Sequence, residues 1–163
     1  MGTDNVDKFN KGAADFYSRS APISDDNRVY CCQCKKYITP DTVKGDVIYP
    51  ALPQFKDKLF YQCRDCKNYC GRSNAKLVTI PTPEVRKLRK EVHEIIDPLW
   101  KDGMVSRGFV YKCMSDYMGY DYHNSSLSEL NEAKKALRAA KTVANKAYIE
   151  FLDNINNRKS TKS

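Results

Sequence analysis

The sequence contains no long apolar run, and none of its segments approaches the roughly 20 residues that a membrane-spanning helix requires. Residues 1–10 also lack the apolar segment of a secretory signal peptide. We therefore expect a protein that does not associate with membranes and stays in the cytoplasm in which it is made. Neither a glycine-rich phosphate loop nor a nucleophile with a partner base is present, which argues against enzymatic activity.

The length and the net charge of the chain limit the number of domains and the class of partner that we expect. With 163 residues, the chain is long enough for one small domain or two coupled subdomains. It carries 28 Lys and Arg against 20 Asp and Glu, a net charge of +8, and 41% of its residues are hydrophobic. This composition is typical of a globular protein rather than a disordered chain, and the positive charge favours an acidic partner.

Cysteine, by contrast, is abundant: there are seven, and six of them lie between positions 31 and 70. An odd number crowded into one part of the chain does not suit a disulfide framework. Cys31 and Cys34 form one C-x-x-C motif, and Cys63 and Cys66 form a second. The two-residue spacer lets a tight turn direct both sulfurs at one centre, and two such turns complete the tetrahedral shell of Zn²⁺. The motifs predict one structural zinc ion held by four thiolates.

The choice of ligands leaves alternatives open. Cys32 and Cys70 adjoin the two motifs, and we interpret both as small apolar residues near the site, although either would be able to replace a ligand. Cys113 falls in an apolar helical pattern and is expected in the core. A thioredoxin-type redox pair occurs singly on a strand-to-helix turn, which two matched motifs do not fit. Because four thiolates leave no position for water, the predicted zinc is structural; His93 or His123 in place of a cysteine would reopen this point.

The order of strand and helix signals predicts an α+β fold. Short β-prone runs at 47–49, 59–61 and 77–80 indicate a small sheet of antiparallel strands around the zinc. The amphipathic patterns that follow indicate a helical unit of about three helices with a long C-terminal helix, and we expect the zinc ribbon to pack on this unit. The expected organisation is a mobile or loosely docked arm at 1–27, a zinc ribbon at 28–80, a helical subdomain at 81–156 and a disordered basic tail at 157–163.

Capping signals place the three helices. A proline directly after a threonine, Pro83, predicts the start of the first helix, and Pro98 is expected to end or kink it. Ser106 and Gly119 suit the two ends of a shorter second helix. The third helix is predicted to begin with the capping box at 126–129 and to continue almost to the C-terminus.

These features resemble a known family, the zinc-finger-containing domain proteins of bacteriophages and prophages. The resemblance rests on both cysteine motifs, on Tyr69-Cys70-Gly71, on the helix pattern Arg86-x₂-Arg89-x₃-His93-x₃-Asp97-Pro98-Leu99-Trp100, on Ser106-Arg107 before Tyr111, and on His123. It covers roughly residues 29–140. Arg72 stands where the family pattern has a histidine, and Asn124-Ser125 where it has Ile-Gly. The resemblance implies a phage origin, a zinc ribbon followed by helices, and expression in a bacterial host cytoplasm, but no reaction.

The excess positive charge is unevenly distributed. Residues 29–80 contain nine Lys and Arg against four Asp, and residues 126–163 contain eight basic against four acidic residues, whereas residues 81–125 balance at seven each. Many of the cations in the zinc ribbon flank aromatic residues that we expect to be exposed, a combination suited to phosphate neutralisation with base stacking. We therefore predict a non-enzymatic protein that binds nucleic acid, either DNA or RNA. The expected contacts are Lys35, Lys36, Arg64, Lys67 and Arg72.

Two other functions remain open. A small phage protein of this charge would also suit a host-takeover or counter-defence role, in which its basic face binds and inhibits or redirects a bacterial host protein. Alternatively, His93 and Asp97, one helical turn apart, would provide the base of a nucleic-acid hydrolase. We interpret this pair as a structural hydrogen bond instead, since no nucleophile or suitably spaced second carboxylate accompanies it.

Overall fold

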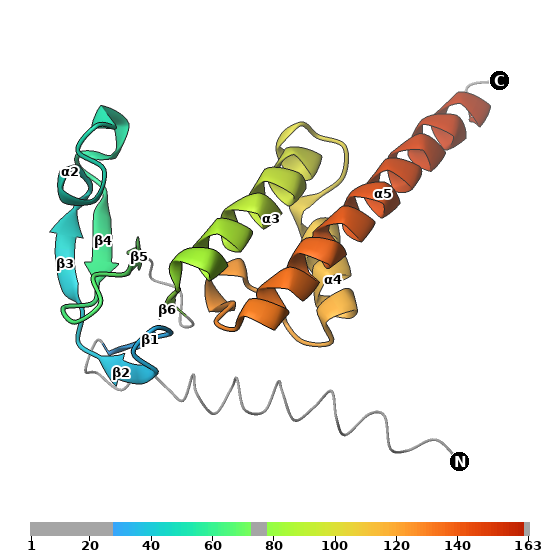
Figure 1. The fold of residues 1–163 in the computed structure, drawn as a ribbon. Coiled ribbons are helices and arrows are strands. Elements are labelled where there is room, and N and C mark those ends of the chain that lie inside the picture. The colour runs from blue at the N-terminus through green and yellow to red at the C-terminus, as the bar shows by residue number, and fades with distance from the viewer. Residues whose placement is uncertain (1–27, 73–77, 162–163) are drawn as a thin grey trace, which may run out of the picture. The chain divides into compact units, whose positions relative to one another are not determined.

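The computed structural model describes residues 28–72 and 78–161, and the predicted arm at 1–27 lies outside the described residues. The described chain is α+β, with short and mostly antiparallel strands, four α-helices and a long C-terminal helix, which confirms the predicted fold class (Figure 1). Its contacts divide it into two units, one of residues 28–86 with 125–129 and one of the remaining helical residues. None of the helices in these ranges is long and apolar enough to cross a bilayer.

The first unit contains two three-stranded sheets. In the first sheet, β1 (Val29–Cys31) is central: it pairs antiparallel with β2 (Lys36–Ile38) and parallel with β6 (Thr79–Ile80). With only two or three residues, each strand buries little apolar surface of its own. The small core beside this sheet includes two of the predicted zinc ligands, and consists of Val29, Cys31, Cys63 and Ile80.

The second sheet is fully antiparallel. Its central strand β4 (Leu59–Gln62) pairs with β3 (Asp41–Lys44) on one side and with β5 (Tyr69–Gly71) on the other. The connection from β3 to β4 contains a single-turn helix, α2 (Gly45–Ile48), and a 3₁₀ turn, η1 (Pro53–Phe55). The predicted runs at 59–61 and 77–80 thus contribute to β4 and β6.

The predicted strand at 47–49 is wrong, because this segment forms the end of α2 and the residue after it. Gly45 is buried and starts the turn: its N–H donates to the Lys58 carbonyl at 2.8 Å, and its carbonyl accepts from the Tyr49 N–H at 2.7 Å. A Cβ at this position would lie 1.8 Å from the Phe55 carbonyl oxygen. The close approach of the two backbones therefore sets the loop, and it overrides the β preference of Val47, whose side chain is exposed.

Helix α3 (Pro83–Lys101) starts where the sequence predicts, and the Thr82 hydroxyl accepts from the Val85 N–H at 3.3 Å. Of the two effects expected of Pro98, an end or a kink, the end does not occur there, since the helix continues to Lys101. A proline removes one helical hydrogen bond, here to the carbonyl of Glu94. Because Pro98 and Glu94 are both exposed, water can replace that bond, and the helix gains the burial of Leu99 by continuing.

In the second unit, α4 (Arg107–Met118) has the two ends that the sequence predicts. The Ser106 hydroxyl accepts from the Phe109 N–H at 3.0 Å, which satisfies one of the free donors at the helix start. Gly119 adopts the left-handed conformation, with φ of 86°, that commonly terminates a helix. Lys135 of the next helix, α5 (Leu130–Ser160), donates to the Met118 carbonyl at 3.2 Å and so links the end of α4 to α5.

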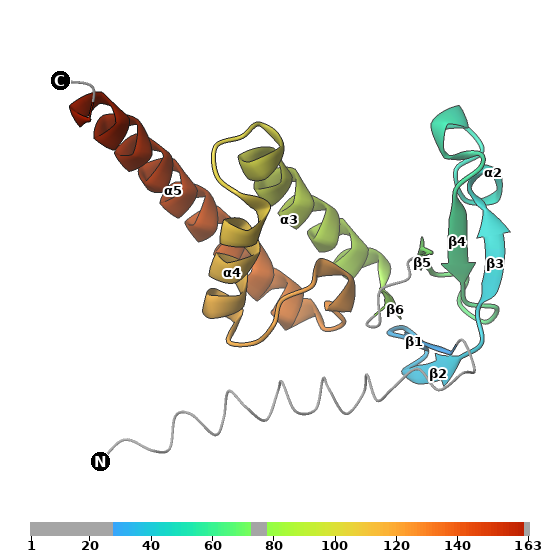
Figure 2. The same cartoon turned by 180° about the vertical axis from the view of Figure 1, so that it is seen from behind.

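Helix α5 (Leu130–Ser160) lies beside α4 in both views (Figures 1 and 2). It begins later than predicted, because Ser126 belongs to the 3₁₀ turn η2 (Asn124–Ser126) and the residues up to Ser128 are buried in other contacts. At its far end the helix continues past residue 156 to Ser160. Its buried side chains are small, which allows close helix packing: Ala133, Ala136, Ala139, Ala140, Val143 and Ala147.

A buried polar chain joins α3 to the segment after α4. The hydroxyl of Tyr122, a residue that is 1% exposed, donates to the Asn124 Oδ1 atom at 2.7 Å, and Asn124 Nδ2 donates to the Arg89 carbonyl at 3.0 Å.

Tyr122→Phe keeps the ring but leaves the Asn124 oxygen without this donor, so we expect a loss of about 1–2 kcal/mol in the free energy of unfolding. Chemical denaturation measures it, with Tyr117→Phe on the exposed side of α4 as the control; equal effects would contradict the interpretation.

Candidate metal centre

Four of the seven cysteines converge in the first unit. Cys31 ends β1 and Cys34 lies in the turn to β2, whereas Cys63 follows β4 and Cys66 lies in the turn that leads to β5. Each sheet therefore contributes one C-x-x-C motif. The four sulfur atoms all lie within 4.8 Å of one another, so the structure brings together the four predicted ligands.

The spacing of the sulfurs fits a tetrahedral ion. The distance between the sulfur atoms is 3.5 Å for Cys31 and Cys66 and 3.7 Å for Cys34 and Cys63. Four thiolates at about 2.3 Å from a tetrahedral zinc lie about 3.8 Å from one another. All seven cysteines are free thiols, so the observed distances do not arise from disulfides. The four thiols fit one structural Zn²⁺, which they would hold without an open coordination position.

The two motifs have equivalent backbones. In each motif the N–H of the second cysteine bonds to the sulfur of the first, from Cys34 to Cys31 and from Cys66 to Cys63. The next residue is left-handed in both cases, with φ of 54° at Lys35 and 61° at Lys67. The sequence gives no sign of this conformation, since lysine rarely adopts it and glycine or asparagine usually marks it.

The surroundings of Cys31, Cys34 and Cys63 shift the pKa values of these thiols. Burial and the adjoining thiols of Cys63 and Cys66 raise the pKa of Cys34 to about 12, and burial also raises the pKa of Cys31. Burial acts in the same direction on Cys63, but the N–H groups of Cys66 and Asp65 outweigh it and lower the pKa of that thiol. Ionisation is thus favoured at Cys63, and a divalent cation would offset the cost of ionising the Cys31 and Cys34 thiols.

The left-handed conformation at Lys67 provides a test of the backbone geometry of the second C-x-x-C motif. Lys67→Val places a β-branched side chain in a region that it strongly disfavours, whereas Lys67→Asn removes the same charge and tolerates the conformation. We expect the valine variant to unfold about 1–2 kcal/mol more easily than the asparagine variant. Thermal or denaturant unfolding of the zinc-loaded proteins measures the difference, and equal stabilities would contradict the left-handed assignment.

The other cysteines lie outside this cluster. Cys32 is buried and its N–H donates to the Ile80 carbonyl at 2.9 Å, while Cys70 packs against the small core from β5. Cys113 is buried on α4, as its helical pattern predicts. Neither His93 nor His123 belongs to the group of four, which is confined to cysteines in the part of the chain that the structure describes.

A family model described as a zinc-finger-containing domain matches residues 24–146, which is most of the chain. The chain belongs to the zinc-finger-containing domain family. The predicted family is therefore confirmed, whereas a phage origin stays a prediction. No curated protein and no solved structure matches the sequence. Because the match extends from the first motif into α5, the domain of this family includes the helices as well as the zinc-binding turns.

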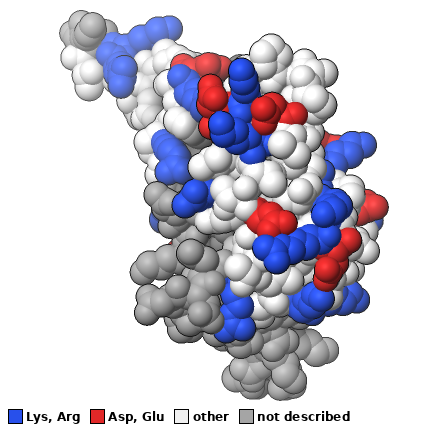
Figure 3. All heavy atoms as spheres, turned by 90° about the vertical axis from the view of Figure 1, so that its left-hand side faces the viewer, with Lys and Arg blue, Asp and Glu red and all other residues white. Residues whose placement is uncertain are grey.

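In this zinc-finger-containing domain protein, the five predicted nucleic-acid contacts are all exposed, but two of them are ion-paired. Lys36 Nζ lies 2.8 Å from the Asp65 carboxylate, and Arg64 Nε lies 2.6 Å from that of Asp41. The hydrogen bond from Lys36 lowers the pKa of Asp65. Basic and acidic side chains accordingly alternate on one face of the molecule (Figure 3).

The other three predicted contacts differ from Lys36 and Arg64 in their ion pairing. Lys35, Lys67 and Arg72 form no ion pair with any residue of the described ranges. Each of the two lysines directly follows a C-x-x-C motif and has a left-handed backbone, and Arg72 directly follows β5. The zinc-binding turns and the end of β5 therefore present the least compensated positive charge among the predicted contacts.

The aromatic residues of the second sheet are less exposed than predicted. Tyr49, Phe55, Phe60 and Tyr69 pack on one another with ring centroids 5.1–6.1 Å apart, and Phe60 is 8% exposed. The guanidinium of Arg86 lies 3.9 Å from the centre of the Tyr69 ring. The expectation of an exposed aromatic surface is wrong for Phe60, whereas Tyr49, Phe55 and Tyr69 are half-buried, because a sheet of such short strands uses these rings as its own core.

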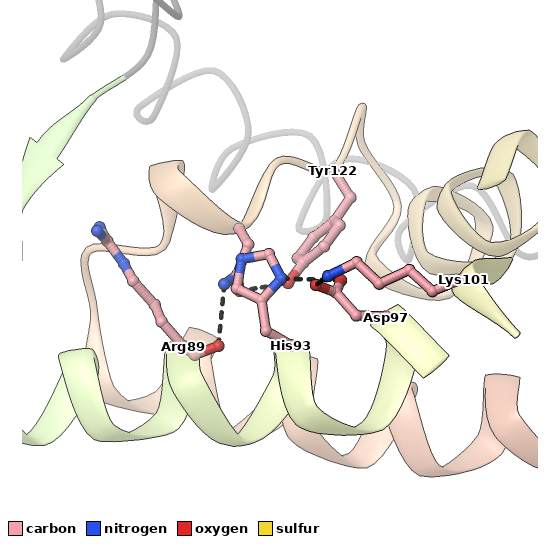
Figure 4. Close-up of polar contacts among 6 residues, drawn as sticks. Arg89, His93, Asp97, Lys101 and Tyr122 are labelled. Carbon is pink, nitrogen blue, oxygen red and sulfur yellow. Dashed lines mark hydrogen bonds and ion pairs between the residues drawn. The ribbon is translucent and has the colours of Figure 1, made fainter. Parts of the chain in front are cut away.

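His93 and Asp97 form the contact that their spacing predicts. The His93 Nδ1 atom lies 3.1 Å from one Asp97 oxygen, and Lys101 Nζ lies 2.8 Å from the other, so both oxygens have partners on α3 (Figure 4). Burial would raise the pKa of Asp97, but the hydrogen bonds from Lys101 and His93 outweigh it and lower the pKa. Tyr122 lies beside this helix (Figure 4), and its hydroxyl donates to Asn124, which in turn donates to the Arg89 carbonyl. Both contacts of Asp97 join residues four positions apart on α3.

Proposed function

We propose that this protein binds nucleic acid without catalysing a reaction on it, and that its zinc-binding turns contact the phosphate backbone. The observation that carries the proposal is the placement of Lys35 and Lys67, each exposed and directly after a metal ligand. A side chain on a backbone that the metal holds fixed loses less conformational freedom on meeting a phosphate. Zinc would act structurally, and the lysines would supply the electrostatic contacts.

The charge around these lysines supports the same function. Residues 29–80 contain nine basic and four acidic residues. The ion pairs of Lys36 and Arg64 are mostly exposed, and pairs of this kind contribute little free energy, so phosphates would compete for both cations. Arg72, with no ion pair to the described residues, adds a further cation near β5.

A salt series tests the proposal. Binding of fluorescent single-stranded and duplex DNA and RNA is measured by anisotropy between low and physiological salt. We expect affinity to fall steeply with salt, and the double variant Lys35→Asn/Lys67→Asn to reduce the slope of log K against log salt by about 2. Asparagine tolerates the left-handed conformation, so the zinc content of the variant is expected to equal that of the wild type.

The matched control removes the same charge elsewhere. Lys90→Gln/Lys112→Gln changes two exposed helix lysines, each paired with an acidic residue four positions later, and is expected to leave the slope nearly unchanged. An affinity that does not depend on salt, or an equal effect of both double variants, would contradict the proposed contacts.

We also infer that the protein is phage-encoded, from the residues that it shares with the phage and prophage proteins named above. For such a protein a bacterial host protein is the other partner class, and it constitutes an outcome of the test. A host protein that is captured equally with and without nuclease, together with no binding to any nucleic acid, would favour that function instead.

A further inference from the structure

The second sheet carries an open pocket beside its aromatic cluster. Its volume is about 520 Å³, which lies in the range of small-ligand sites. It is formed by the end of the β3–β4 connection, the start of β4 and the end of β5. The lining residues are Phe55, Lys58, Leu59, Phe60, Gly71 and Arg72.

The pocket exists because a side chain is missing from β5. Gly71 pairs with Phe60 across the strands, so a side chain at position 71 would stand beside the Phe60 ring. A Cβ at Gly71 would meet no atom within 4 Å, and its φ lies outside the left-handed region. The glycine is therefore not required by a close backbone contact, in contrast to Gly45, and its effect is to leave space against the rings.

The chemistry of the lining combines ring surface with positive charge. Phe55 and Phe60 provide aromatic walls, Lys58 and Arg72 provide two cations, and the lining contains no carboxylate. Lys58 Nζ lies 4.9 Å from the centre of the Phe55 ring. The ring is thus accessible to a polar group from solvent, because an exposed lysine is easily displaced. A ligand that matches both features is planar and carries a phosphate.

We propose that this pocket binds one nucleotide of a single-stranded nucleic acid, with the base against the aromatic walls and the phosphate between Lys58 and Arg72. The inference rests on the proposed function and specifies its substrate class. Bases in a duplex are stacked and paired, so their faces do not reach such a pocket, whereas the bases of a single strand do. A free nucleoside monophosphate shares this chemistry and is the other possible source of the ligand.

The experiment fills the pocket without changing its charge. Gly71→Leu in the full chain places an apolar side chain in the empty space, and its affinity for a 12-nucleotide single strand, a duplex of the same sequence and uridine monophosphate is compared with that of the wild type. We expect the variant to bind the single strand at least about tenfold more weakly, with duplex binding changed less than about twofold. Zinc content and the circular dichroism spectrum verify that the fold persists.

A second pair of variants keeps the test valid should leucine disturb β5. Lys58→Ala/Arg72→Ala removes the two pocket cations, and Lys44→Ala/Lys56→Ala removes one exposed cation of β3 and one of the β3–β4 connection, neither of which lines the pocket. We expect the first double variant to lose single-strand affinity several-fold more than the second. Equal losses, together with unchanged binding by the leucine variant, would overturn the inference.

The outcomes also separate the pocket from the proposed function. Salt-dependent binding of single strand and duplex alike, unaffected by Gly71→Leu, would leave nucleic-acid binding in place and refute the pocket. Binding of uridine monophosphate that Gly71→Leu abolishes, with no strand bound, would retain the pocket with a free nucleotide as its ligand and refute the proposed function. Binding of neither strand nor nucleotide would refute both.

Discussion

Cys34→Ala is expected to abolish stoichiometric zinc binding and to unfold the first unit. The two motifs approach the same point from different sheets, and the core beside them has only four buried side chains, with a few partly buried residues packed against it. Structural zinc contributes about 10 kcal/mol or more to the folding of small modules, which is comparable with the whole stability of a domain. Metal analysis and the dispersion of amide signals from residues 28–72 in NMR spectra measure the two effects.

Cys32→Ala and Cys70→Ala are the matched controls, since both remove a thiol within one or four residues of a ligand. We expect each control to retain one zinc ion and a folded first unit, with at most the modest cost of a smaller side chain in or near the core. A zinc-free Cys70→Ala protein, beside a Cys34→Ala protein that still binds one ion, would show that the ligand set differs from the four thiols that converge here.

Gly45→Ala is expected to destabilise the first unit by at least about 2 kcal/mol, because an added Cβ overpacks a backbone contact. That Cβ would lie 1.8 Å from the Phe55 carbonyl oxygen, so the β3–β4 connection must shift. The shift would also break the hydrogen bond from Gly45 N–H to the Lys58 carbonyl and move the ring of Phe55 away from Tyr49. Chemical denaturation of the zinc-loaded protein measures the loss.

Gly71→Ala tests whether the effect at Gly45 comes from close approach rather than from the loss of a glycine. Its Cβ would meet no atom within 4 Å, so its stability should stay within about 0.5 kcal/mol of the wild type or rise slightly. A similar loss in both variants would contradict the account of the β3–β4 connection.

The zinc centre could be predicted from the sequence because its information is local. A C-x-x-C spacing fixes the geometry of one turn, and two such turns leave few alternatives to a shared metal. The left-handed backbone of the two lysines could not be predicted, because the C-x-x-C turn imposes this conformation against the preference of lysine. At Lys35 and Lys67 the metal site thus determines the backbone against the local propensity.

The loop from β3 to β4 shows the opposite case. Val47, Ile48 and Tyr49 have strong β preference, yet they lie in or next to α2, since the buried Gly45 binds the backbone on the other side of the loop. That contact joins positions 45 and 58, and no local pattern encodes it. The aromatic cluster was missed for the same reason, because Tyr49 and Tyr69 meet only after the sheet has formed.

The helices were predicted well where a cap decides their ends. Ser106 and Gly119 bound α4 as expected, since each satisfies backbone groups within a few residues. The start of α5 could not be predicted in this way, because Ser126 belongs to the turn η2 and both Ser126 and Ser128 are buried. Thr79 donates to the Ser125 carbonyl in the same turn. A capping sequence predicts a helix start only when its residues do not belong to another turn.

X-ray absorption at the zinc edge, on protein purified with its metal content determined, tests the central claim most directly. The account predicts one zinc ion per chain surrounded by four sulfur atoms at about 2.3 Å, with no lighter scatterer in the first shell. A nitrogen or oxygen ligand, which would indicate a histidine or a water molecule, or a chain that purifies folded without any zinc, would contradict it.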